Sequence, residues 1–243
     1  MKKYAFTLAE TLITLGVIGV VSSITLPVLI NYHKSLVLKT QFNKAYNELQ
    51  QINQSFIKDY DLNICEHNWQ MWNETGDPSA SILATSEVFI KYYNGSLPDA
   101  NKPLHTYNEV KNLTGDGVIR EALFDDAQAV DLQQRTFYFE YGMNEVKCPI
   151  ITVDINGYYK KPNQMGVDIF SFRPTKNGKI LPLGEPNSLT DQIDGSGFLG
   201  RESCTCTRKI QNSTVNGLCC AYWASIDVNP DNNSKAYWTS FVK

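Results

Sequence analysis

The stretch MKKYAFTLAETLITLGVIGVVSSITLPVLI, residues 1–30, decides how the rest of the chain is interpreted. Two lysines precede a long apolar run in which Glu10 is the only formally charged side chain before Lys34. About 20 apolar residues, rising 1.5 Å each along a helix, span the roughly 30 Å hydrocarbon core of a bilayer. The run from Thr11 to Ile30 is therefore long enough to be a membrane segment.

A cleaved secretory signal is the alternative interpretation of this stretch. Lys2 and Lys3 make a basic start, and Val21-Ser22-Ser23 offers small residues for a signal peptidase. Glu10 argues against it, because an acid in an apolar segment costs about 2.5–3.5 kcal/mol at mid-bilayer and less near the interface. An acid at this position indicates a positively charged partner for its carboxylate. A newly formed α-amino group could be that partner.

The leader and the Phe6-Thr-Leu-x-Glu10 pattern resemble the class III signal of type IV pilins and type II secretion pseudopilins. The resemblance implies cleavage by a prepilin peptidase between Ala5 and Phe6, followed by N-methylation of Phe6. It also implies that Glu10, fifth in the mature chain, meets the Phe6 amine of a neighbouring subunit, and that Pro27 kinks the stem helix. The family usually has Gly before the cut, where this chain has Ala5.

Helical periodicity continues beyond the apolar run. Apolar side chains recur at three- and four-residue spacing, which predicts one buried stripe; they include Val37, Leu38, Phe42, Ala45, Tyr46, Leu49, Ile52 and Phe56. We expect residues 1–5 to be a leader, 6–30 the transmembrane half and 31–60 the amphipathic half of one helix of about 50 residues. A coiled coil is the alternative, but only about three heptads fit.

Residues 61–243 are expected to form one globular domain with a variable middle segment and a Cys-rich C-terminal region. Alternating or branched patterns predict four antiparallel strands, within Arg135–Tyr141, Pro149–Ile155, Val167–Arg173 and Lys179–Leu183. Residues 81–93 are predicted to be a helix. The stretch 153–172 again resembles the sheet of pseudopilin-like proteins. The fold class is therefore α+β and pilin-like, with the long N-terminal helix packed on an antiparallel sheet.

Two runs of the chain are rich in side-chain oxygens. Asp154, Asn156, Asn163 and Asp168 supply hard oxygens in one loop, and such loops bind calcium in some secretion pseudopilins, although the spacing is not that of an EF-hand. The alternative is that these residues simply make the turn. A second run is predicted to be a solvated loop; it contains Asp227, Asn229, Asp231 and Asn232.

Six cysteines in an exported domain indicate disulfides rather than free thiols; they are Cys65, Cys148, Cys204, Cys206, Cys219 and Cys220. The C-x-C and C-C arrangements lack the C-x₂₋₄-C spacing of zinc sites. We expect Cys204 or Cys206 to pair with Cys219 or Cys220.

No enzymatic motif is visible in the sequence. The three histidines lie in no catalytic pattern, and there is neither a phosphate loop nor H-E-x-x-H. A net charge of −3 gives no basic footprint, so nucleic acid is not the expected partner. Two tryptophans and two tyrosines are expected in the core rather than on an adhesive face: Trp69, Trp72, Tyr92 and Tyr93.

The favoured function is a structural, non-enzymatic subunit, a pseudopilin or minor pilin, of a type II secretion or type IV pilus-like filament. The alternatives are a tip adhesin or DNA-binding minor pilin, and a secreted soluble protein with an ordinary signal. The resemblance implies other pilin subunits, a prepilin peptidase and methyltransferase, an inner-membrane assembly platform and lipid as partners. It places the chain as a single-pass protein of a bacterial inner membrane, with its C-terminal domain outside the cytoplasm, and later in a filament.

Overall fold

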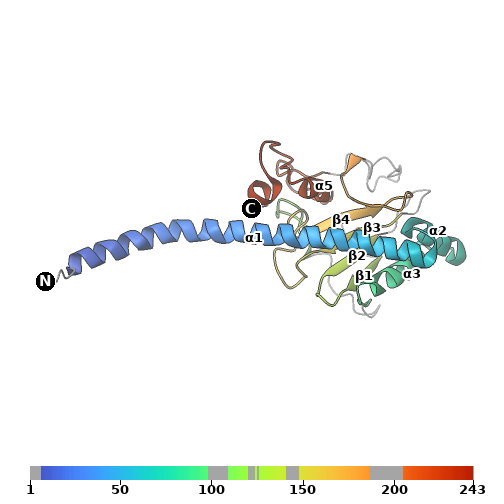
Figure 1. Ribbon diagram of the computed structural model, residues 1–243. Helices are drawn as coiled ribbons and strands as arrows, with labels where there is room; N and C mark the ends of the chain where they lie inside the picture. Colours follow the sequence, from blue (N-terminus) through green and yellow to red (C-terminus); the bar gives the residue numbers. More distant parts are fainter. Residues whose placement is uncertain are drawn as a thin grey trace.

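The computed structural model describes residues 7–97, 109–119, 124, 126–140, 148–186 and 205–242. A long helix carries a globular domain at its C-terminal end (Figure 1). The helices are α1 (Leu8–Tyr60), α2 (Ile64–Thr75), α3 (Pro78–Lys91), α5 (Cys220–Ser225) and the π-helix η3 (Tyr237–Phe241). The strands are β1 (Ala127–Val130), β2 (Thr136–Glu140), β3 (Ile150–Asp154), β4 (Ile169–Pro174) and β5 (Ile180–Pro182). This is an α+β architecture.

Helix α1 is continuous over 53 residues, as the periodicity predicts. It begins at a capping box made by Thr7 and Glu10, and it ends where Asp61 adopts a left-handed conformation with φ 55°. Pro27 lies inside the helix. Figure 1 shows the stem curving smoothly through this region without a break.

The second half of α1 packs into the domain along one stripe, whose buried members are Ser35, Phe42, Ala45, Leu49, Asn53 and Phe56. The Phe42 ring meets Phe170 of β4 edge-on, with ring centroids 4.8 Å apart, and lies 5.5 Å from Trp238 of η3. Asn53 donates a hydrogen bond of 2.9 Å to the backbone oxygen of Gly178. The predicted amphipathic half is therefore a core helix of the domain.

The five strands form one antiparallel meander in the order β1-β2-β3-β4-β5. The four predicted strands are present, and β1 is additional. Alternate residues face α1, and this face is aromatic and aliphatic: Phe137, Phe139, Ile151, Val153, Phe170 and Phe172. The sheet thus buries the stem stripe.

The opposite face of the sheet is also covered. Tyr138 and Ile169 join a second apolar cluster with Val110, Met165 and Leu218, which come from the segments around the sheet. Between them, the Thr152 and Ser171 hydroxyls form a hydrogen bond of 2.8 Å. Strands β3 and β4 are consequently buried on both faces.

A hairpin of α2 and α3 closes the end of the domain farthest from the start of the stem (Figure 1). The predicted helix of residues 81–93 is α3, whereas α2 is an addition to the prediction; Asn63 caps it, and Gly76 ends it with φ 68°. The sequence predicts that Trp69, Trp72, Tyr92 and Tyr93 lie in the core. This prediction is wrong for Trp69, which is 43% exposed, and right for Tyr93, which is 9% exposed.

Disulfides link distant parts of the domain. Cys65 in α2 pairs with Cys148 just before β3, and Cys206 pairs with Cys220 at the start of α5. The second bond confirms the prediction that the C-terminal cysteines close a short loop. Cys219 is also disulfide-bonded, and Cys204 lies outside the described residues.

The run from Asp227 to Asn232 is not the solvated loop that the sequence predicts. The carboxylate of Asp227 lies 2.7 Å from the Lys39 ammonium of the stem, and Asn229 is only 7% exposed. Asp231 accepts a hydrogen bond of 2.8 Å from the backbone N–H of Arg208. The oxygens of this run are used to fasten the C-terminal region to the stem and to itself.

Candidate functional site

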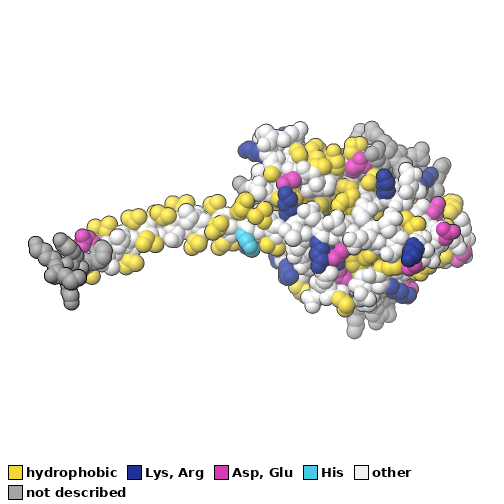
Figure 2. All heavy atoms as spheres, viewed as in Figure 1, with side chains coloured by type: hydrophobic (Ala, Val, Ile, Leu, Met, Phe, Trp, Pro, Cys, Tyr) yellow, Lys and Arg dark blue, Asp and Glu magenta, His cyan; other side chains and the backbone are white. Residues whose placement is uncertain are grey.

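The first part of the candidate site is the free half of the stem. Every side chain from Thr7 to Lys34 is exposed except the half-buried Ser22. Figure 2 shows this segment as a rod of apolar side chains projecting from a domain with a mixed surface. Among the described residues, α1 is the one helix whose length and composition suit a membrane span. A helix this apolar needs either lipid or other helices around it.

Glu10 lies at the start of this rod. Its carboxylate accepts hydrogen bonds of 2.8 Å from both the backbone N–H and the hydroxyl of Thr7, and the Glu10 N–H donates to that hydroxyl at 3.2 Å. The acid is therefore held at the positive end of the helix dipole. Sequence reasoning missed the role of Thr7, although the Thr-x-x-Glu spacing is a capping-box signature. Ala5 and Phe6 lie outside the described residues.

The second part is the β3–β4 loop with its two aspartates. Asp154 accepts hydrogen bonds from the backbone N–H groups of Asn156 at 3.3 Å and Gly157 at 2.9 Å. Asp168 accepts from the backbone N–H groups of Asn163 at 3.0 Å and Gln164 at 2.7 Å. Asp168 also accepts from the Asn156 side-chain amide at 3.3 Å. Each carboxylate therefore shapes one turn of the loop, as the turn interpretation predicts.

The turn interpretation leaves buried oxygens in this loop unused. Among the described residues, no hydrogen-bond partner is present for Oδ2 of Asp154, Oδ1 of Asn156 or either polar atom of the Asn163 side chain. Asp154, Asn163 and Asp168 are fully buried. A buried polar atom without a partner costs about 1–3 kcal/mol, so this loop requires a further explanation.

The electrostatics of the loop are unfavourable to two bare carboxylates. Burial raises the pKa of Asp154 to about 8, with a further contribution from the charge of Asp168. Burial also raises the pKa of Asp168 to about 6, although hydrogen bonds from Gln164 and Asn163 oppose the shift. A proton or a cation would relieve this repulsion.

Calcium prefers oxygen ligands of the kind this loop leaves unused. The unpartnered oxygens of Asp154, Asn156 and Asn163, and the carboxylate of Asp168, are chemically of this kind. The described residues contain no cluster of three or more His, Cys, Asp or Glu side chains. A cation here would therefore depend on two carboxylates assisted by amide and backbone oxygens.

We expect the free energy of unfolding of the domain, in chelator-treated buffer, to fall as pH rises from about 5 to 9. The folded pKa values of about 8 for Asp154 and about 6 for Asp168 lie above the unfolded value near 3.9, so the folded state binds more protons. The stabilisation that these two protonated carboxyl groups give the folded state is fully present below pH 3.9. It is lost as the pH rises through the folded pKa values of about 6 and 8. The expected loss between pH 5 and 9 is on the order of 5 kcal/mol, at about 1.4 kcal/mol for each pH unit over which one group stays protonated only in the folded state, and urea denaturation measures it.

Asp154→Asn is the matched control for this pH dependence. The amide keeps the oxygen that accepts from Gly157 and removes the titrating charge. The variant should unfold with a flatter pH dependence than the wild type between pH 6 and 9. If the free energy of unfolding changed equally with pH in both proteins, ionisation of Asp154 would not destabilise the folded state, and the prediction would be wrong.

A buried ion cluster joins the stem to the sheet, and no local sequence pattern predicts it. The Arg135 guanidinium, 5% exposed, lies 2.7 Å from Glu48 of α1 and 2.6 Å from Asp131 of the β1–β2 turn. It also lies over the Tyr93 ring, 5.4 Å from the centroid. Burial lowers the pKa of Arg135, but the two carboxylates outweigh it and the net shift is upward. The cluster fixes the domain on the stem.

The chain was compared with protein-family models, with curated proteins and with solved structures, and none of the three comparisons found a match.

Proposed function

We propose that this chain is a structural, non-enzymatic filament subunit of the type IV pilus-like or type II secretion kind, a pilin-like pseudopilin or minor pilin. One observation carries the proposal. A single 53-residue helix exposes nearly all of its first, apolar half and buries a stripe of its second half against an antiparallel sheet. Such a helix serves as a lipid anchor and then as a shared core when copies assemble.

The remaining features support the same proposal. The single acid of the apolar segment lies at the helix start and accepts a hydrogen bond from Thr7, the residue that follows the position where the family signal implies a new α-amino group. Disulfides are typical of a domain exported to an oxidising compartment. We therefore infer a single-pass protein of a bacterial inner membrane that works with a prepilin peptidase and an assembly platform.

Processing tests the proposal. Mass spectrometry of the membrane fraction from cells with a prepilin peptidase should find a chain that begins at methylated Phe6. Ala5→Gly should be cleaved at least as completely, whereas Ala5→Leu should keep the leader, because the position before the cut has to be small. A chain that begins at Ile24 would identify an ordinary signal peptide and contradict the proposal.

As a second part of the proposal, we infer that the β3–β4 loop binds calcium. The unpartnered oxygens of Asp154, Asn156 and Asn163 support it. At pH 8, millimolar calcium should raise the urea midpoint of the chelator-treated wild type and leave Asp154→Asn unchanged, since bound ligand stabilises only the folded state. Magnesium serves as the ion control. Equal midpoints with and without calcium would leave the loop as a turn alone.

A further inference from the structure

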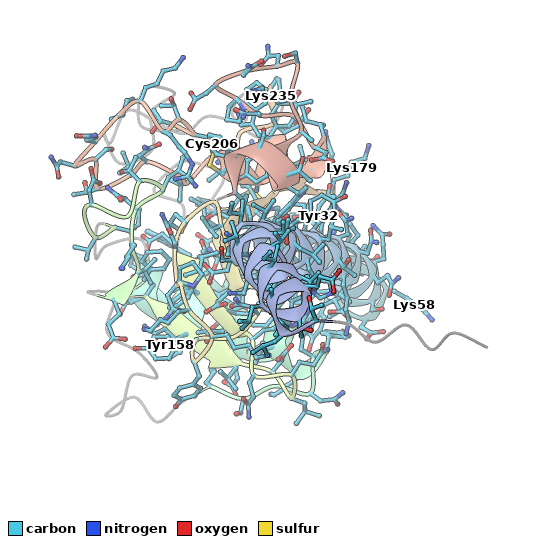
Figure 3. All side chains as sticks on the ribbon, turned by 90° about the vertical axis from the view of Figure 1, so that its left-hand side faces the viewer. Tyr32, Lys58, Tyr158, Lys179, Cys206 and Lys235 are labelled. Atoms are coloured by element: carbon cyan, nitrogen blue, oxygen red, sulfur yellow. A yellow bond between two sulfur atoms is a disulfide. The ribbon has the colours of Figure 1, made fainter. Side chains whose placement is uncertain are left out.

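The sheet topology places two connections at the end of the domain that faces the start of the stem. In an antiparallel meander the β1–β2 and β3–β4 connections share one end and the β4–β5 turn lies at the other. Lys44 donates a hydrogen bond of 2.7 Å to Gln133 in the first connection, whereas Asn53, farther along α1, reaches Gly178 in the β4–β5 turn. Figure 3, which looks along the stem from its start, shows Tyr158 of the β3–β4 loop to the lower left of the stem.

This stem-facing end carries exposed apolar and basic side chains. We call it the foot and define it as Lys44, Leu132, Tyr159, Lys160 and Lys161. Leu132 is 79% exposed and Tyr159 is 81% exposed, more than any other large apolar side chain of the described residues outside the stem. The three lysines are exposed. Lys44 lies 3.8 Å from Glu48, and the nearby acids Glu48 and Asp131 are both paired with Arg135. The foot is therefore cationic with apolar tips.

The opposite end of the domain has the complementary character. We call it the cap and define it as residues 58–91, the end of α1 together with the α2–α3 hairpin. It has six exposed acids and two lysines: Asp59, Asp61, Glu66, Glu74, Asp77 and Glu87 against Lys58 and Lys91. Figure 2 shows acidic side chains gathered at this end. Trp69 and Leu83, 43% and 47% exposed, are apolar sites among these acids.

We propose that the foot of one copy of this chain docks on the cap of the next copy, lysines against carboxylates and Leu132 and Tyr159 against Trp69 and Leu83. This inference deepens the proposed filament function and rests on it. Within one chain Lys44 and Tyr60 differ by 16 positions, about 24 Å along α1, so α1 itself holds these two parts of the foot and the cap apart.

The geometry favours an open chain of copies rather than a closed pair. A contact between two different surfaces is heterologous, and when its repeat does not close into a ring it generates a filament. Parallel stems that are shifted along their axis bring the foot of one domain towards the cap of its neighbour. Charge complementarity of this kind selects the register and the partner.

Zero-length carbodiimide crosslinking of the full chain, in isolated membranes and in sheared filaments, tests the docking directly. This reagent joins a lysine to a carboxylate only where the two are in contact. Mixed ¹⁴N- and ¹⁵N-labelled protein should give crosslinked peptides of Lys160 or Lys161 with Glu74 or Glu87 that combine both labels. Crosslinks elsewhere, with none between foot and cap in material that forms filaments, would overturn the proposal.

Charge reversal supplies an independent readout. The foot variant Lys160→Glu/Lys161→Glu and the cap variant Glu74→Lys/Glu87→Lys should each lower filament yield about tenfold. The four-fold combination should recover to within about twofold of the wild type. All four side chains are exposed, so thermal melting should be unchanged. Lys209→Glu, an exposed lysine outside both surfaces, is the matched control and should assemble normally.

The outcomes separate the docking from the filament function. Crosslinks between foot and cap without any filament would sustain the docking and refute the filament function. Filaments whose yield is unchanged by either reversal, or a combination no better than the worse parent, would overturn the docking alone. A defect in the foot variant with a normal cap variant would point to anionic lipid as the occupant and would equally overturn it.

Discussion

Glu10→Val is expected to reduce filament yield more than tenfold, while the chain remains processed, folded and resident in the membrane. Breaking a desolvated ion pair by removing one partner costs about 3–5 kcal/mol, because the other charge stays buried. In the proposed filament that other charge is the Phe6 amine of a neighbouring copy. Shearing followed by immunoblotting at matched expression measures the yield.

Glu10→Gln separates the charge from the helix cap. Glu10 also accepts two hydrogen bonds from Thr7, and a glutamine at this position of a capping box keeps them. Loss of the cap costs only about 1 kcal/mol. If the inter-subunit charge matters, the Gln variant assembles as poorly as the Val variant. A Gln variant that assembles like the wild type would assign the whole effect to capping.

Arg135→Met is expected to lower the free energy of unfolding of the domain by about 3–5 kcal/mol. The substitution leaves Asp131, with a 1% exposed side chain, and Glu48 without the cation that both contact. Methionine fills a similar volume, so the loss reports the stranded charges rather than a cavity. Urea denaturation, followed by tryptophan fluorescence, measures it.

Lys39→Met is the matched comparison for this cluster. It removes another ion pair between the stem and the rest of the domain, Lys39 with Asp227, whose side chains are 37% and 31% exposed. A solvent-screened pair contributes about 0–1 kcal/mol. Equal losses for the two variants would contradict the view that the buried Arg135 cluster fixes the domain on the stem.

Much of the architecture follows from patterns that are local in the sequence. The stripe through Phe42, Leu49 and Phe56 predicts the helix from its period alone, and alternation predicts β2 and β4. Helix α2 has local signals at its ends, the capping box of Asn63 and Glu66 and the glycine at position 76, but it has no apolar stripe like that of α1. Its buried residues depend on α3 and on the disulfide between Cys65 and Cys148, which are contacts between distant parts of the chain.

The candidate site is predictable in its residues and only partly in its chemistry. The spacing of Asp154 and Asp168 indicates a turn or a cation site, and the hydrogen bonds confirm the turn. The sequence does not tell which oxygens the turn leaves unpartnered, because that depends on where each backbone N–H points. Arg135 and Glu48 meet only after the sheet has docked on the stem.

In the proposed function, the apolar half of α1 first anchors this domain in the membrane and then carries it into a filament. The most direct measurement is mass spectrometry of the intact chain recovered from filaments sheared off cells. A chain that begins at methylated Phe6 in the sheared fraction is the predicted result. A chain found only in the membrane or the soluble fraction, with Met1 or Ile24 at its start, would contradict the proposed function.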